Sequence, residues 1–290
     1  MFKKSSLLSL GLCLLVLFSL LIGCGSQQAS SSNNKNSEQA SPVADEGQST
    51  LDKVLKNGKL TVAVFSDVPP LGFNNEKNEL IGIDIEVAKA MAEALDVKIE
   101  FVPTTNANRI PYLLSNKVDC VIASFTMNSE RRKVVEYSDA YFRGGAILVV
   151  NTEKPTSAAI KGIDDLKGKN VAVSKGSFND ELATKLVGDA ANIIRFDNVS
   201  DLYEALKTGK ADAIVEDVVL AGYVTKNQYP TMKTAGDLLS IDTWGIGVRR
   251  GDQIWLNWLN GFVFDLLSSG QMKEICNKYG VDYNPVHYVY

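Results

Sequence analysis

The feature that most constrains the fold is an alternation of strand and helix patterns that runs along the chain and then restarts. Apolar, β-branched segments at 59–65, 99–103 and 118–125 are separated by helical patterns at 83–96 and 108–116. This order predicts an α/β fold with an open, mainly parallel sheet and helices on both of its faces.

The second half of the predicted folded region repeats sequence segments of the first half. IDDLKGKNVAVSKG echoes LDKVLKNGKLTVAVF, and EALKTGKADAIVEDV echoes YLLSNKVDCVIASFT, in the same order. Two copies of one βαβ unit are therefore expected, over 51–149 and 150–246. The last two helical patterns are expected to pack back on the first copy. This gives one lobe of 51–149 plus 247–290, a second lobe of 150–246, and two crossings that form a hinge.

The amino-terminal segment is not predicted to be part of the fold. Lys3 and Lys4 precede an apolar run that ends at a small residue, which predicts a signal peptide over 1–23. Leu21 to Cys24 resemble the bacterial lipobox, whose cysteine is acylated. Residues 24–50 hold few large apolar side chains and predict a disordered tether behind the lipid anchor. An uncleaved membrane helix is the alternative.

Charge and cysteine usage exclude several functions. The net charge of −4 opposes nucleic-acid binding, which needs a basic surface. Cys120 and Cys276 are expected to be buried free thiols, with a disulfide as the alternative. The cysteine spacing predicts no metal site, and nothing indicates a cofactor. The single histidine, His287, lies near the end of the sequence and is interpreted as a surface residue, which disfavours a nucleophilic triad.

Polar residues gather where the predicted strands end, which is where open α/β sheets bind ligands. In the first lobe, segments 66–73, 104–109 and 124–131 offer hydroxyls, backbone N–H groups and two arginines. In the second lobe, 174–178 and 216–218 offer a Gly-Ser helix start and two carboxylates. Guanidinium and N–H donors bind a carboxylate, and a carboxylate binds an ammonium. The pairing suits a zwitterion such as a free α-amino acid.

Two of these residues also have a purely structural interpretation. Arg131, Arg132 and Lys133 crowd the first turn of a predicted helix, where the helix dipole disfavours cations. Either all three are solvated, or one awaits an anion from outside the chain. Asp217 can bind an ammonium, or it can cap the helix predicted after it.

The order of these motifs resembles the polar amino-acid family of ABC-transporter solute-binding proteins. The resemblance covers nearly all of 51–280 and includes the signature G-x-D-x-x-x-A-x-A-x-A, which begins at Gly82. It implies a type II periplasmic-binding-protein fold, in which two Rossmann-like lobes are joined by a two-strand hinge and the ligand is buried between them.

The resemblance also implies roles for individual residues. Arg131, in the T-x-x-x-E-R pattern, is expected to bind the α-carboxylate with help from Ser124 and Thr126, and Asp217 to bind the α-ammonium. The remaining expected contacts are a pocket wall at Phe73, a helix start at Gly176 and Ser177, and a side-chain contact at Asp67. The sequence departs from the family pattern at two positions. Leu71 stands where many members have an aromatic residue, which weakens the case for aromatic stacking on the ligand, and Phe178 stands where serine or threonine is common, which removes one expected hydroxyl contact.

Arg109 is the residue most informative about the ligand. It lies in an NRIP segment that resembles glutamate- and aspartate-binding members, and a buried guanidinium needs an anionic partner. Glutamate or aspartate is therefore favoured, with cystine, cysteine or glutamine as alternatives, and cationic amino acids are disfavoured. The structural alternative pairs Arg109 with Asp67 or Glu216 inside the protein.

These observations predict a monomeric binding protein without catalytic activity. It is expected to sit on the outer side of the cell membrane, held by its lipid, and to deliver the amino acid to an ABC permease. An enzyme on the same fold, a cyclohexadienyl-type dehydratase, is the alternative from another class; Glu216 is its one evident general acid. A sensor module would need a membrane helix or signalling domain further along the chain.

Overall fold

The computed structural model describes residues 48–283, all within the unit that runs from Glu46 onward. The expected signal peptide, the acylation site at Cys24 and the surface residue His287 lie outside the described residues. Among residues 48–283, no helix is both long enough and apolar enough to cross a membrane.

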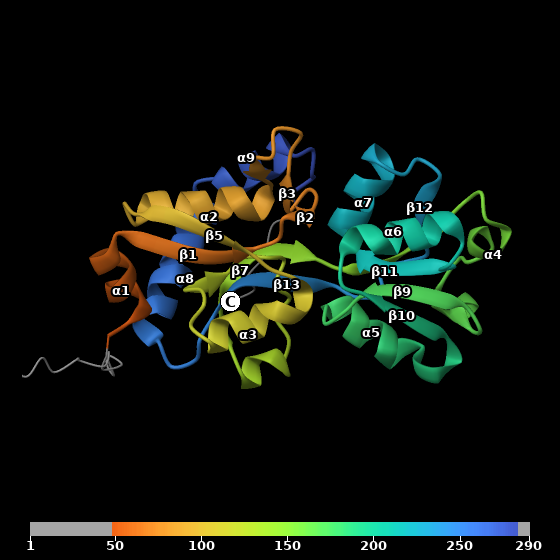
Figure 1. Ribbon diagram of the computed structural model, residues 1–290, viewed down its shortest axis with the longest axis horizontal. Helices are drawn as coiled ribbons and strands as arrows, with labels where there is room; N and C mark the ends of the chain where they lie inside the picture. Colours follow the sequence, from red (N-terminus) through yellow and green to blue (C-terminus); the bar gives the residue numbers. More distant parts are fainter. Residues whose placement is uncertain (1–47, 284–290) are drawn as a thin grey trace, which may run out of the picture. The chain divides into compact units, whose positions relative to one another are not determined.

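The first lobe is built on a five-stranded sheet in the order β5-β1-β6-β13-β7 (Figure 1). Strand β1 pairs in parallel with β5 and β6, whereas β13 runs antiparallel to β6 and β7. Strand β1 is the central strand of this parallel triplet and is covered on both faces, which is why its sequence is apolar at most positions. The strands are β1 (Lys59–Val64), β5 (Lys98–Pro103), β6 (Cys120–Val121), β7 (Glu136–Gly144) and β13 (Asp242–Val248).

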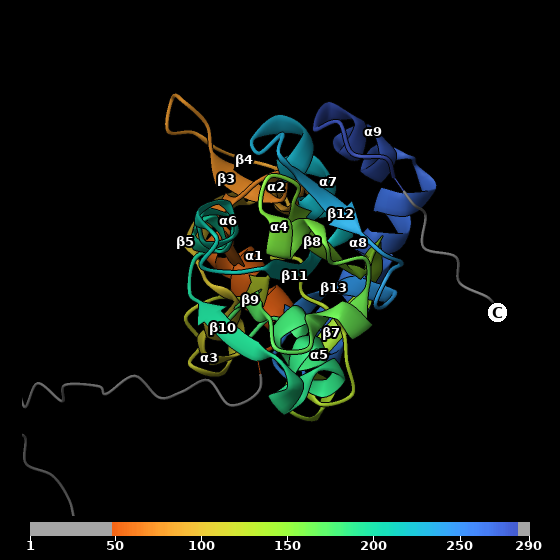
Figure 2. The same ribbon diagram turned by 90° about the vertical axis from the view of Figure 1, so that its right-hand side faces the viewer.

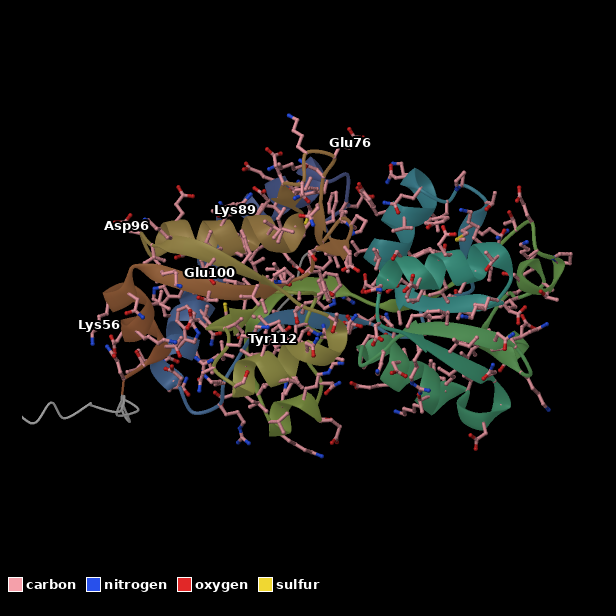
Figure 3. All side chains as sticks on the ribbon, in the orientation of Figure 1. Lys56, Glu76, Lys89, Asp96, Glu100 and Tyr112 are labelled. Atoms are coloured by element: carbon pink, nitrogen blue, oxygen red, sulfur yellow. The ribbon has the colours of Figure 1, made fainter. Side chains whose placement is uncertain are left out.

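Helices cover both faces of this sheet, and α2 and α3 lie on opposite sides of it in Figure 1. A small antiparallel sheet of β2, β3 and β4 precedes α2. The bounds are α1 (Thr50–Asn57), β2 (Asp67–Val68), β3 (Gly72–Asn74), β4 (Leu80–Ile81), α2 (Ile83–Ala94), α3 (Arg109–Leu114), α8 (Gln253–Ser268) and α9 (Gln271–Lys278). In Figure 3, the charged side chains of Lys56, Lys89 and Asp96 point outward from this lobe.

The second lobe repeats the arrangement with the strand order β10-β9-β11-β8-β12. Strand β9 is parallel to β10 and β11, as β1 is to β5 and β6, so the expected duplication of the βαβ unit is present. Helices α5 and α6 lie on opposite sides of these strands (Figure 2). The bounds are β8 (Ala146–Asn151), α4 (Pro155–Ala158), β9 (Asn170–Ser174), α5 (Phe178–Leu186), β10 (Asn192–Phe196), α6 (Val199–Thr208), β11 (Ala213–Asp217), α7 (Val218–Asn227) and β12 (Met232–Ala235).

The chain changes sheets earlier than the sequence boundaries of 149/150 and 246/247 place it. Strand β7 ends at Gly144 in the first sheet and β8 begins at Ala146 in the second. The return lies between β12 and β13, so β13 belongs wholly to the first sheet. The sequence predicts crossings near 145–150 and 241–247, close to where they lie, but only hydrogen-bond partners show that β8 belongs to the second sheet and β13 to the first. The two crossings touch: a Cβ on Gly145 would lie 2.5 Å from the carbonyl oxygen of Ser240.

The folded body also begins before residue 51, inside the segment expected to be tether. Helix α1 starts at Thr50, and the Ser49 hydroxyl accepts a hydrogen bond from the backbone N–H of Asp52 at 3.1 Å. Ser49 and Thr50 are both buried. Small polar residues predict a tether here, but a serine N-cap satisfies a free N–H group at a helix start.

Candidate functional site

A cavity of about 40 Å³ lies between the lobes, at the ends of the strands. That volume accommodates a few water molecules and is too small for an amino acid. The first lobe contributes Phe65, Val68, Leu71, Asn106, Arg109, Ser124, Thr126, Asp242 and Trp244. The second lobe contributes Ser174, Ser177, Phe178, Asn179, Val199, Glu216, Asp217 and Leu220.

The G-x-D signature that begins at Gly82 positions the backbone of Ser124 at the cavity. Gly82 has φ +135°, and a Cβ there would overlap the carbonyl oxygen of Leu71, so the start of α2 requires glycine. The start of α2 also carries the buried Asp84, which accepts hydrogen bonds from the Ser124 backbone N–H and the Tyr141 hydroxyl, each at 2.8 Å. Burial raises the pKa of Asp84 to about 6. Asp84 thus holds Ser124 in its left-handed conformation, with φ 37°.

Arg109 is a buried cation on the cavity wall with no carboxylate partner among the described residues. Its side chain donates only to carbonyl oxygens, from Nε to Asn106 and from Nη1 to Ala123 and Ser124, at 3.0 to 3.2 Å. Burial, and then the charge of Arg131, lower its pKa to about 9, so it remains a cation at neutral pH. The alternative that paired Arg109 with Asp67 or Glu216 is wrong.

The three consecutive cations lie in different environments, and they do not open an α-helix. Residues 131–133 form a single 3-10 turn, and the Asn128 side chain accepts a hydrogen bond from the Arg131 backbone N–H at 2.8 Å. Arg132 and Lys133 are exposed, whereas Arg131 is buried. The Arg131 guanidinium lies beside the cavity, where Nη2 forms an ion pair with Glu181 of the second lobe at 2.8 Å.

Three carboxylic acids line the same cavity as Arg109: Glu216 and Asp217 from the second lobe and Asp242 from the first. Burial raises the pKa of Glu216 to about 7 and that of Asp242 to about 6. Burial, followed by the charge of Asp242, also raises the pKa of Asp217. Glu216 Oε2 and Asp242 Oδ1 have no hydrogen-bond partner among the described residues. A Cβ on Gly144 would lie 2.6 Å from Asp217 Oδ2 and 3.0 Å from Asp242 Oδ1, so these two carboxylates converge on one point.

Asp217 caps the helix that follows it and also lines the cavity. Its Oδ1 accepts from the backbone N–H of Val219 at 2.8 Å and caps α7, and Oδ2 accepts from the N–H of Gly145 at 3.3 Å. Ser177 similarly lines the cavity while its hydroxyl accepts from the N–H of Asp180 and caps α5. Helix capping therefore places both side chains at the cavity.

The structure brings Ser124, Thr126, Asp217, Arg109 and Ser177 together, but not every expected residue lines the cavity. Phe73 packs edge-on against Tyr279, at 6.4 Å between ring centroids, and Phe65 and Leu71 form the apolar wall instead. Asp67 is exposed. Gly176 lies over Ala107, which leaves no room for a side chain.

Sequence reasoning missed Asn106, Asp242 and Trp244. Asn106 lies in the TTNAN segment after β5, and its amide donates to the Ser174 hydroxyl of the second lobe at 2.9 Å. Asp242 and Trp244 lie on β13, directly after the second crossing, and this segment is outside the strand ends at which the sequence predicts ligand contacts. The cysteines behave as expected: Cys120 and Cys276 are free and buried.

This cavity between two duplicated lobes agrees with what comparison with known proteins shows. A glutamine-binding protein of Geobacillus stearothermophilus is 34% identical over 84% of this chain and 92% of its own. The L-cystine-binding protein TcyJ of Escherichia coli is 30% identical over 82% of this chain and 88% of its own. The structure of an ancestral arginine-binding protein bound to arginine superposes with a TM-score of 0.71 and 38% identity, covering 77% of this chain and 98% of that one.

The fold is therefore the expected type II periplasmic-binding-protein fold. The sequence also matches a known family over residues 60–282, from β1 through α9. That match includes both lobes, both crossings and every described residue that lines the cavity. The chain belongs to the bacterial extracellular solute-binding proteins, family 3.

Proposed function

We propose that the chain is the extracytoplasmic amino-acid-binding component of an ABC importer, which captures an acidic or polar L-amino acid between its lobes and delivers it to the permease. Arg131, Ser124 and Thr126 would bind the α-carboxylate, and Asp217 the α-ammonium. Ser177 would face the ligand from the start of α5. Glutamate or aspartate is favoured as the ligand.

The observation that carries the proposal is the state of Arg109. Its guanidinium is 2% exposed, lines the cavity, and is balanced by no carboxylate within hydrogen-bonding distance among residues 48–283. A buried cation that is hydrogen-bonded only to neutral carbonyls has no ion-pair partner, and a second carboxylate on the ligand would supply one. Burial raises the pKa of Glu216 to about 7, which reduces the negative charge of the site near neutral pH and so favours a ligand with an acidic side chain.

The alternatives are cystine, cysteine or glutamine, and the relatives named for glutamine and cystine support them. Each offers polar groups for Arg109 without a mismatch of charge. A cationic amino acid such as arginine would place its charge near Arg109 unless its side chain pointed to the three acids.

The proposal extends to the anchoring of the protein. Cys24 would carry the lipid, and residues 24–47 would tether the body to the outer side of the cell membrane. A monomer is sufficient, because both halves of the ligand site come from one chain.

The test is a thermal-shift screen of the purified protein against the free L-amino acids, followed by calorimetry. A ligand at 100 times its dissociation constant adds about 2.7 kcal/mol to the free energy of unfolding, which is a clear rise in melting temperature. Glutamate or aspartate should give the largest rise. No response to any amino acid would overturn the proposed function.

A dehydratase is the second candidate, and the buried Glu216 favours it, because a general acid works best when its pKa is near the working pH. Incubation with a cyclohexadienyl acid such as prephenate separates the two functions. The binding-protein proposal predicts no product above that formed in buffer alone.

A further inference from the structure

The rim of the cavity carries a direct ionic contact between the lobes. Glu181, in the first turn of α5, reaches across the cleft with both oxygens. Its Oε1 accepts from Arg131 Nη2 and its Oε2 accepts from Asn128 Nδ2, both at 2.8 Å. Among residues 48–283, this is the one ion pair that joins the two lobes.

This contact uses the part of Arg131 that a ligand would need. Nη2 donates to Glu181 and also to the Gly176 carbonyl oxygen at 3.4 Å, so both of its hydrogens are engaged. A planar guanidinium grips a carboxylate in bidentate fashion through Nη1 and Nη2 or through Nε and Nη2. Because Nη2 belongs to both pairs, no second carboxylate can be held this way while Glu181 remains.

Glu181 can leave at little cost, whereas Arg131 cannot remain alone. The Glu181 side chain is 46% exposed and would return to water, but that of Arg131 is 6% exposed. A buried cation that loses its partner is strongly destabilising, so another anion must replace the one that departs. The start of α5 survives the exchange, because its cap is formed by Ser177 and Asp180 and not by Glu181.

We propose that Glu181 is an affinity-setting residue that acts as an internal competitor of the ligand. Its carboxylate binds Arg131 and joins the two lobes, and a ligand carboxylate binds by taking its place. The inference rests on the proposed amino-acid-binding function. It accounts for a cavity too small for an amino acid, since the closed lobes are joined by the protein's own carboxylate.

The consequence is that removing Glu181 should strengthen binding. We call the Glu181–Arg131 ion pair the latch. Only protein molecules in which the latch is broken can bind the ligand, so the apparent dissociation constant is the intrinsic constant divided by the fraction of molecules with a broken latch. Ion pairs of this partly exposed kind correspond to a gain of about fivefold in affinity.

Calorimetry with L-glutamate, L-glutamine and L-cystine tests the competition. Glu181→Ala should bind the responding probe about fivefold more tightly than the wild type. Glu181→Asp, which keeps the charge but shortens the reach, should behave like Glu181→Ala. The control is Glu130→Ala, which removes an exposed carboxylate paired with Lys133 beside Arg131 and should leave the affinity unchanged. Unchanged or weaker binding by Glu181→Ala would overturn the proposal.

A measurement without ligand keeps the two proposals separate. Small-angle X-ray scattering of the ligand-free proteins should give a larger radius of gyration for Glu181→Ala than for the wild type, because the lobes separate. Equal radii would refute the latch even if amino acids bind. A wild type that binds none of the free amino acids would refute the proposed function, while the scattering result still decides on the latch.

Discussion

Replacing Arg109 with methionine separates the recognition of the ligand side chain from that of its backbone. Arg109 lies between two rings, with Cζ 5.8 Å from the centroid of Phe65 and 4.6 Å from that of Phe125. Methionine is unbranched and flexible and replaces the apolar stem of arginine, so Arg109→Met removes the charge and the donors while it fills part of the space. The substitution also leaves Arg131 and Asp217, the proposed partners of the ligand backbone, in place.

The expected loss depends on the charge that the ligand brings. Because Arg109 is 2% exposed, a carboxylate bound to it is desolvated. Truncating one partner of such a buried pair costs about 2 to 5 kcal/mol, or ~30-fold to several-thousand-fold in affinity. A neutral amide loses one ordinary hydrogen bond, worth about 1 kcal/mol or roughly fivefold. Glutamate should therefore lose far more affinity than glutamine.

The assay is calorimetric titration of both ligands into the wild type, Arg109→Met and Arg132→Met. Arg132 is an exposed cation of the same lobe and does not line the cavity, so it controls for net charge. The melting temperature of each ligand-free protein is recorded first, because Arg109→Met leaves three carbonyl oxygens without their donor. Equal losses for glutamate and glutamine, or none for either, would refute the assignment of Arg109 to a ligand carboxylate.

Three further predictions follow from the site. Arg131→Met should weaken glutamate and glutamine by similar factors, because both carry the α-carboxylate; calorimetry that finds only glutamate affected would contradict its role. Burial keeps Glu216 protonated up to a pKa of about 7, against 4.5 in an unfolded chain, so the free energy of unfolding should fall as pH rises through this window. Urea titrations at several pH values should show this slope reduced in Glu216→Gln; an unchanged slope would mean that Glu216 is ionised. Gly82→Ala, which would meet the Leu71 carbonyl, should lower the free energy of unfolding by about 1 to 3 kcal/mol or more. Gly58→Ala, which has positive φ and open space around it, should cost less, and equal costs would show that crowding is unimportant.

Much of the architecture was predictable because it is encoded locally. The apolar segment at 59–65 predicts a strand of a mainly parallel sheet, and it forms β1, which is parallel to both of its neighbours. The duplicated phrases predicted two similar sheets, and both sheets keep their parallel triplet. The lobe boundaries were less accessible. Strand β8 continues the apolar pattern of β7, and only its pairing with β11 and β12 assigns it to the second sheet.

The sequence by itself determined which chemical groups stand at the strand ends: two arginines and hydroxyls in one lobe, and carboxylates in the other. Residue type and position after a strand suffice for that prediction. Only the tertiary structure decided how these groups pair. Arg131 meets Glu181, fifty positions away on the other lobe, whereas Arg109 meets only carbonyl oxygens. The physical reason is that an ion pair depends on separation in space and on burial, and both arise when the two lobes close on each other.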